Sequence, residues 1–128
     1  MLDRTTDAGL CTEVMALNAL SVISSNCASP SYAPWNDMFD LMGQSGILSV
    51  AATMNNTSNV DSQGDVPTGC SSDFLVAVTN TTSSDVKNSG AAYGLTTIDL
   101  GAPGTNVYST YSSGGYTNMT GTSMASPQ

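Results

Sequence analysis

Ile47-Leu48-Ser49-Val50-Ala51-Ala52 is the stretch that decides the fold class. It is a short apolar run of the kind that forms a strand covered on both faces of a sheet. A helix is expected directly before it, because Pro34 suits a first helical turn and Gly43 or Gly46 can end one. Between these positions, apolar residues recur at helical spacing at Trp35, Met38, Phe39 and Met42. The order is therefore a helix followed by a buried strand.

Further strands are expected downstream. Phe74-Leu75-Val76-Ala77-Val78 is a second continuous apolar run. Ile98–Leu100 and Val107–Ser109 are shorter strand candidates, separated by the turn residues Gly101-Ala102-Pro103-Gly104. The stretch Thr79–Ser89 is too polar to be expected in the core. Helices on both sides of short buried strands predict an α/β fold with a mostly parallel sheet and flanking helices.

The length and the absence of histidine limit what the chain can do alone. Its 128 residues and 13.1 kDa suit one modest domain, and 40% hydrophobic residues suffice for a core. The sequence contains no His. Mechanisms that need an imidazole base, an imidazole metal ligand or a histidine pH switch therefore cannot be completed within this chain.

The charge is sparse and acidic, with Arg4 and Lys87 as the only basic residues and a net charge of −8. Phosphate binding needs clustered Lys or Arg, so we expect neither nucleic acid nor a membrane surface as a partner. No apolar run approaches the roughly 20 residues of a transmembrane helix. A surface rich in Ser, Thr and Asn but poor in Lys and Glu favours an extracellular or secreted parent protein.

The amino-terminal part carries no export signal in this interpretation. Val14–Ile23 is apolar and could be a helix that gives way to a strand, but acidic residues precede it and a cationic region is missing. The three cysteines allow at most one intrachain disulfide, and small buried hydrophobes are an equal alternative. These cysteines are Cys11, Cys27 and Cys70.

Gly121-Thr122-Ser123-Met124-Ala125-Ser126-Pro127 is the most specific string in the sequence. It resembles the nucleophile motif Gly-Thr-Ser-Met-Ala-x-Pro of the subtilisin-like serine proteases, the subtilases. The resemblance implies that Ser123 is the nucleophile at the start of a helix, where main-chain N–H groups and the helix dipole stabilise negative charge. A helix N-cap is the ordinary role of a lone Ser, but the surrounding small residues let backbone approach backbone and a substrate carbonyl.

A second stretch supports the resemblance. Gly46 to Asn55 is similar to the subtilase strand that ends in Ala-Ala-Gly-Asn, whose Asn donates to the oxyanion. Asn55 is therefore the candidate donor, together with the Ser123 amide, and the Thr122 hydroxyl would support it. Met54 stands where the family has Gly, so a shifted register with Asn56 as donor is the alternative. By the same carry-over, Ala52, Thr53 and Met54 would line the S1 pocket.

Two further blocks match the family in the same order. Pro67–Cys70 running into Phe74–Val78 is similar to the loop and strand after the oxyanion Asn, and Ile98–Gly104 with Val107–Thr110 is similar to Asp-Leu-x-Ala-Pro-Gly-x-x-Ile-x-Ser-Thr. The resemblance implies a partial subtilisin-like three-layer fold. Residues 1–128 are expected to be one partial catalytic domain, well matched over 29–127 and weakly over 1–26.

The family's catalytic Asp block and its His-Gly-Thr-His block have no counterpart in this chain, and Gln128 stands where the family has His. We therefore expect part of a serine endopeptidase that acts on polypeptide substrates and is inactive by itself. The rival interpretation is a non-catalytic extracellular binding or structural module with a protease-like core. A third is self-association through exposed sheet edges, since a partial parallel sheet leaves edges unpaired.

Asp61, Asp65 and Asp99 have interpretations that do not involve the nucleophile motif. Asp61 and Asp65 flank a Gly and are a candidate structural Ca²⁺ site, as subtilases often bind calcium; the alternative is a solvated acidic loop, because no Asp-x-Asp-x-Asp-Gly loop is present. No other metal and no required cofactor are expected. Asp99 is interpreted as structural, because the family's triad acid lies far upstream.

Overall fold

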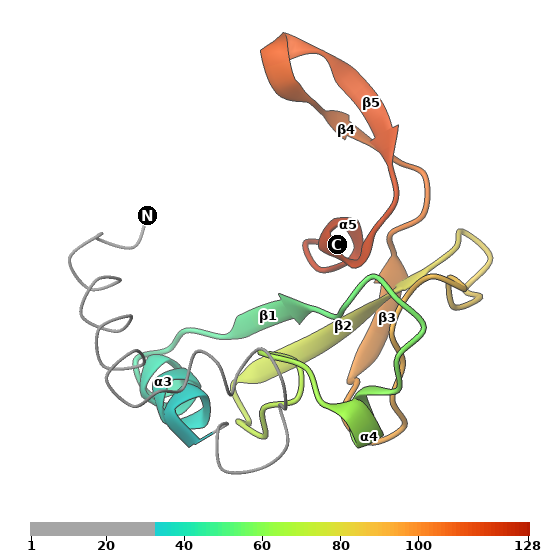
Figure 1. Ribbon diagram of the computed structural model, residues 1–128. Coiled ribbons are helices and arrows are strands. Elements are labelled where there is room, and N and C mark those ends of the chain that lie inside the picture. The colour runs from blue at the N-terminus through green and yellow to red at the C-terminus, as the bar shows by residue number, and fades with distance from the viewer. Residues whose placement is uncertain (1–32) are drawn as a thin grey trace.

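The computed structural model describes residues 33–128, and Figure 1 shows how their helices and strands are arranged. The expectations for Val14–Ile23 and for Cys11 and Cys27 lie outside the described residues. Within the described part, no helix has the length and apolar character needed to cross a membrane.

A three-stranded parallel sheet forms the centre of the described structure (Figure 1). Strands β1 (Ser49–Ala52), β2 (Leu75–Thr81) and β3 (Leu100–Pro103) lie in the order β1-β2-β3. Ala51 pairs with Ala77 in one ladder, and Asn80 pairs with Ala102 in the other. With helices beside this sheet, the predicted α/β class is confirmed.

Helix α3 (Ala33–Gln44) packs on one face of the sheet, where the sequence placed a helix. Phe39, Ala51 and Leu75 form the buried cluster on this face, and Trp35, Met38, Met42 and Cys70 pack against it. The apolar residues that recur at helical spacing therefore face the sheet. Gly46 adopts a left-handed φ of 82° just after the helix, a conformation that glycine allows without strain.

The opposite face carries the short helix α5 (Thr122–Ala125). Its Ala125 packs with Val78 of β2 and Ala102 of β3, and Val76 lies against them. Successive strand residues point to opposite faces, which separates these residues from the cluster under α3. On the α5 side, Val50 and Leu100 are 49% and 46% exposed, so α5 covers only part of this face.

The expectation that Thr79–Ser89 is too polar for the core is wrong at its beginning. Strand β2 continues to Thr81, and Thr79, Asn80 and Thr81 are all buried. Two of these side chains have distant partners: the Thr79 hydroxyl donates to the Ala92 carbonyl at 2.6 Å, and Asn80 Oδ1 accepts from the Thr105 hydroxyl at 3.0 Å. Hydrogen bonding offsets the cost of burying these groups.

Two other boundaries differ from the prediction. Residues Gly101–Pro103, expected as a turn, belong to β3, where Gly101 lies so close to β2 that an added Cβ would be 2.7 Å from Thr81 Cγ2. Helix α4 (Val60–Gln63) falls in a stretch where the sequence predicted no helix. Asn59 caps it by accepting from the Asp61 backbone N–H at 3.0 Å, which is a typical role for Asn.

A β-hairpin projects from the sheet and leads into α5 (Figure 1). It consists of β4 (Val107–Thr110), the 3₁₀ turn η2 (Ser112–Gly114) and β5 (Tyr116–Met119). Strand β4 was predicted, whereas β5 was not. The rings of Tyr108 and Tyr116 stack across the hairpin with centroids 5.7 Å apart, although both side chains are largely exposed. Such cross-strand aromatic pairs stabilise a ribbon that has little core of its own.

Candidate active site

Close backbone approach holds α5 against the end of the sheet. The Gly121 N–H donates to the Gly104 carbonyl at 2.9 Å. A Cβ added at Gly104 would lie 2.6 Å from the Gly121 oxygen, 2.7 Å from Asn80 Oδ1 and 2.8 Å from Ala125 Cβ. No side chain fits there. Glycine at position 104 therefore allows the Ala-Pro-Gly block and the Gly-Thr-Ser block, separated in sequence, to touch in the fold.

Thr122 joins α5 to the loop that follows β1. Its side chain is buried, and its hydroxyl lies 2.5 Å from the Thr53 carbonyl, to which it donates, and 3.2 Å from Asn55 Oδ1. Its backbone N–H donates to the same Asn55 oxygen at 2.9 Å. A hydrogen bond thus joins the predicted nucleophile segment to the predicted oxyanion segment, 67 residues apart in sequence.

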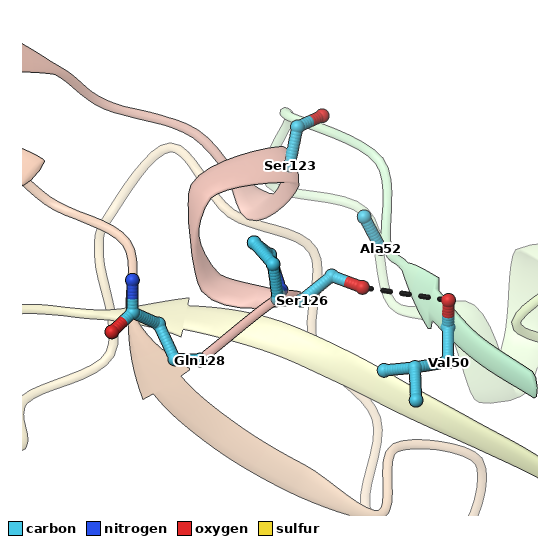
Figure 2. Close-up of a pocket in the computed structure, with 6 residues that line it drawn as sticks. Val50, Ala52, Ser123, Ser126 and Gln128 are labelled. Carbon is cyan, nitrogen blue, oxygen red and sulfur yellow. Dashed lines mark hydrogen bonds between the residues drawn. The ribbon is translucent and has the colours of Figure 1, made fainter. Parts of the chain in front are cut away.

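Ser123 is exposed and stands in the first turn of α5, where backbone N–H groups have no acceptor within the helix. Figure 2 shows its hydroxyl directed away from the helix, with Ala52 on the neighbouring strand end. Both residues line an open depression of about 740 Å³ together with Val50, Ser126, Pro127 and Gln128. The Ser126 hydroxyl donates to the Val50 carbonyl at 3.4 Å, which links the end of α5 to β1.

Asn55 and Asn56 have different surroundings. The side-chain oxygen of Asn55 accepts from the Thr122 backbone N–H and lies 3.2 Å from the Thr122 hydroxyl, and this orients its amide nitrogen relative to α5. Asn56 instead accepts from the Ser58 backbone N–H at 2.9 Å, and its Nδ2 lies 3.6 Å from Met54 Sδ. Asn56 therefore stabilises a local turn in the manner typical of Asn, whereas Asn55 reaches the segment that carries Ser123.

The three residues expected to line the S1 pocket are placed differently. Ala52 lines the depression beside Ser123. Thr53 is only 3% exposed and extends the ladder by donating from its backbone to the Val78 carbonyl at 3.1 Å. Met54 is half-buried, and its backbone carbonyl accepts from the Ala92 N–H at 3.0 Å. Of the three side chains, only that of Ala52 lines the depression next to the nucleophile candidate.

Asp61 binds a neighbouring loop. Its carboxylate accepts from the Thr97 hydroxyl at 2.5 Å and from the backbone N–H groups of Leu95, Thr96 and Thr97. The Thr97 hydroxyl is the main cause, with hydrogen bonds from Leu95 and Thr96, of a pKa lowered from 3.8 to about 2. Hydrogen bonds to the charged form act in this direction. The exposed carboxylate is consequently ionised over almost the whole pH range.

Asp65 is buried, and its Oδ2 accepts from the Met54 backbone N–H at 3.1 Å and from the Thr68 hydroxyl at 2.5 Å. Its partners are therefore different from those of Asp61. Over residues 33–128, no group of three or more His, Cys, Asp or Glu side chains is arranged to hold a metal ion.

Asp99 contributes to the sheet and lies outside the candidate site. Its Oδ2 accepts from the Ala77 backbone N–H at 2.7 Å, which extends the β2–β3 pairing by a side chain. The structural interpretation of this carboxylate agrees with this contact.

Sequence reasoning did not predict the burial of two polar residues near the site. Asp65 was considered as a metal ligand or as part of a solvated acidic loop, but it is buried, and Asn80, 2% exposed, was placed outside the core. Asn80 lies beneath Gly104, next to α5. One signal for Asn80 was available: it directly follows the apolar run of β2 and is itself followed by Thr, so a longer strand was compatible with the sequence.

Comparison with known proteins gives a consistent result. The model of the subtilase family matches residues 13–128. Subtilisin DY of Bacillus licheniformis is 37% identical over 111 residues, which are 86% of this chain and 40% of that protein. An extracellular protease of Xanthomonas campestris pv. campestris is 40% identical over 89 residues, covering 64% of this chain and 14% of that protein. The chain thus spans well under half the length of these relatives.

Solved structures agree with the sequence comparison. A cold adapted subtilisin-like serine proteinase superposes with a TM-score of 0.53 and 38% sequence identity, covering 66% of this chain and 29% of that chain. The parallel sheet and its flanking helices are therefore arranged as in part of a subtilisin-like α/β fold, as the sequence predicted.

Proposed function

Because the chain belongs to the subtilase family, we propose that it supplies the nucleophile and the oxyanion-binding part of a serine endopeptidase. Ser123 Oγ attacks the peptide carbonyl carbon, and the proton of its hydroxyl passes to a base and then to the leaving amine. Water hydrolyses the resulting acyl-enzyme. With no His in this sequence, residues beyond it would supply the imidazole and its orienting carboxylate.

One contact carries this proposal: the 2.9 Å hydrogen bond from the Thr122 N–H to Asn55 Oδ1. Because the oxygen of the Asn55 amide is engaged by the helix, its Nδ2 is the group left to donate to a substrate. The Ser123 N–H, in the first turn of α5, is the second donor. Both would act on the oxygen that becomes negative as Ser123 attacks. Thr122 supports the pair by holding Asn55.

The substrate would be a polypeptide, with Ala52 in the wall of the site next to Ser123. Secretion of the parent protein is part of the proposal, supported by the composition and by a relative named as an extracellular protease. A structural Ca²⁺ near Asp61 and self-association through the outer sheet edges are lesser proposals. Calcium-dependent melting and light scattering at high concentration test them.

A hybrid enzyme tests the proposed roles. The chain is fused behind the amino-terminal part of Subtilisin DY that precedes the matched region, and hydrolysis of a chromogenic peptide is measured. We expect turnover that Ser123→Ala abolishes. Asn55→Ala should lower kcat by about 10² to 10³, the loss known from removing one such donor in a subtilisin, with KM little changed. Asn56→Ala is the matched control and should retain activity.

Two outcomes would contradict these roles. Equal losses in Asn55→Ala and Asn56→Ala would remove the special role of Asn55. A folded hybrid without turnover would favour the binding or structural module instead. The chain by itself should not hydrolyse the peptide at an enzyme-like rate, and robust turnover abolished by Ser123→Ala would overturn that expectation.

A further inference from the structure

We propose that the buried carboxylate of Asp65 is a positioning residue for Asn55. This inference rests on the proposed function, because the orientation of Asn55 matters for catalysis only if Asn55 donates to the oxyanion. Asp65 is not among the residues that line the depression beside Ser123. Its effect would pass through one peptide unit of the main chain.

That peptide unit joins Thr53 to Met54. Its N–H belongs to Met54 and donates to Asp65 Oδ2 at 3.1 Å. Its carbonyl belongs to Thr53 and accepts from the Thr122 hydroxyl at 2.5 Å. A peptide unit is planar and rigid, so its carbonyl and N–H turn together. Asp65 and Thr122 therefore hold opposite ends of one rigid plate, which is separated from Asn55 by a single further peptide unit.

The Thr53–Met54 peptide unit is linked to Asn55 not only along the chain but also through Thr122. The Thr122 hydroxyl that bonds the Thr53 carbonyl also lies 3.2 Å from Asn55 Oδ1, and the Thr122 N–H bonds that oxygen. A negative charge on the N–H side polarises the peptide and makes its carbonyl a stronger acceptor for Thr122. The chain of contacts thus runs from Asp65 through the plate to Thr122 and Asn55.

Burial and hydrogen bonds fix the position of Asp65 itself. The residue is 8% exposed, and its carboxylate accepts from the Thr68 hydroxyl, which belongs to a fully buried side chain. Its backbone carbonyl accepts from the Gly69 N–H at 2.7 Å. Charge-assisted bonds to a backbone N–H are stronger than neutral ones, and fixed partners limit the freedom of the side chain. The loop 65–70 therefore presents a fixed acceptor to Met54.

Asp99 provides a matched control. Its Oδ2 accepts from the Ala77 backbone N–H at 2.7 Å, so it too is a carboxylate that bonds one main-chain amide of the sheet. Within residues 33–128 it bonds neither the Thr53–Met54 peptide unit nor Thr122. Asp65→Asn and Asp99→Asn remove the same charge from the same kind of bond, and only the first should affect Asn55.

The experiment is amide hydrogen exchange and NMR on the full 128-residue chain. In Asp65→Asn, we expect exchange at Met54 and Thr122 to rise about tenfold relative to the amides of β2, with a shift of the Asn55 side-chain NH₂ resonances. In Asp99→Asn, the rise should be confined to Ala77 and its neighbours. A uniform rise throughout the sheet in Asp65→Asn would mean that Asp65 only stabilises the fold, and it would overturn the proposal.

A change at Met54 alone, without Thr122 and Asn55, would overturn it as well. If Asp65→Asn does not fold, Thr68→Val is the second variant, because it removes the hydroxyl that donates to Asp65 Oδ2 at 2.5 Å. Exchange at Met54 and Thr122 should again rise relative to β2, with a shift of the Asn55 NH₂ resonances, and unchanged Thr122 exchange and Asn55 resonances would count against positioning. These readouts need no turnover. An inactive hybrid with coupled Asn55 resonances would therefore refute the proposed function alone, and an active hybrid without coupling would refute the role of Asp65 alone.

Discussion

Helices α3 and α5 pack on opposite faces of the same parallel sheet, but different interactions hold them there (Figure 1). Helix α3 has twelve residues and presents Phe39 to an apolar cluster. Helix α5 has four residues, and Thr122 and the approach to Gly104 attach it. Apolar packing tolerates small shifts. Hydrogen bonds and close backbone contact define position more narrowly, which suits the helix that carries Ser123.

The largest effect should come from the α3 side. Phe39→Ala removes a ring that is 7% exposed and leaves a cavity between α3 and the sheet. We expect a loss of about 3 kcal/mol in the free energy of unfolding, measured by urea denaturation. Phe39→Leu should lose much less, because it retains most of the volume. Equal losses in both variants would show that the ring shape, rather than apolar volume, holds α3.

Gly104→Ala probes the close contact under α5. The added Cβ would lie 2.6 Å from the Gly121 carbonyl oxygen, a backbone atom that cannot rotate away. We expect a loss of about 2 kcal/mol and faster exchange of the Gly121 amide. Gly90→Ala is the matched control, because its nearest neighbour, Asn88 Oδ1, would lie at 3.4 Å. If both variants were equally stable, close approach would not fix α5.

The two helices also show which features of the structure the sequence could predict and which it could not. Helix α3 was predicted, because its apolar spacing is a property of the local sequence. Ser123 was found only because a contiguous motif resembles a family, since a four-residue helix has no periodicity to detect. The contact between Asn55 and Thr122 joins residues far apart in sequence, and no local pattern predicts such a bond.

The buried end of β2 was mispredicted for a related physical reason. Thr79 and Asn80 look like surface residues, because polar groups are costly to bury without partners. Their partners, the Ala92 carbonyl and the Thr105 hydroxyl, come from later loops whose position depends on the complete fold. Helix α4 was missed because it has only four residues, with one of them, Val60, buried.

Thr122→Val should have a moderate effect. Valine keeps the shape but removes the hydroxyl that bonds the Thr53 carbonyl and contacts Asn55, and so leaves a carbonyl without this partner. We expect a loss of about 1 to 2 kcal/mol in the free energy of unfolding. Thr122→Ser keeps the hydroxyl and should retain most of the wild-type free energy of unfolding. Wild-type stability in Thr122→Val would mean that apolar packing of Ala125 suffices to hold α5.

The smallest effect should come from Asp61, whose bonds to the Leu95–Thr97 loop are exposed to water. Its pKa is lowered to about 2 from an ordinary 3.8, first by the Thr97 hydroxyl. A group whose pKa is lowered by folding stabilises the fold above the unfolded pKa, and this contribution is lost as the pH falls through the folded one. The loss should therefore occur between about pH 4 and about pH 2.

Asp61→Asn should make the melting temperature less dependent on pH in that window, with Asp37→Asn, on helix α3, as control. The measurement is a series of thermal melts through the acid range. An unchanged acid slope in Asp61→Asn would mean that the exposed carboxylate adds nothing to stability. Such a result would separate the exposed from the buried hydrogen bonds of this fold, since solvent competes with the Asp61 bonds but is excluded from the Thr122 hydroxyl.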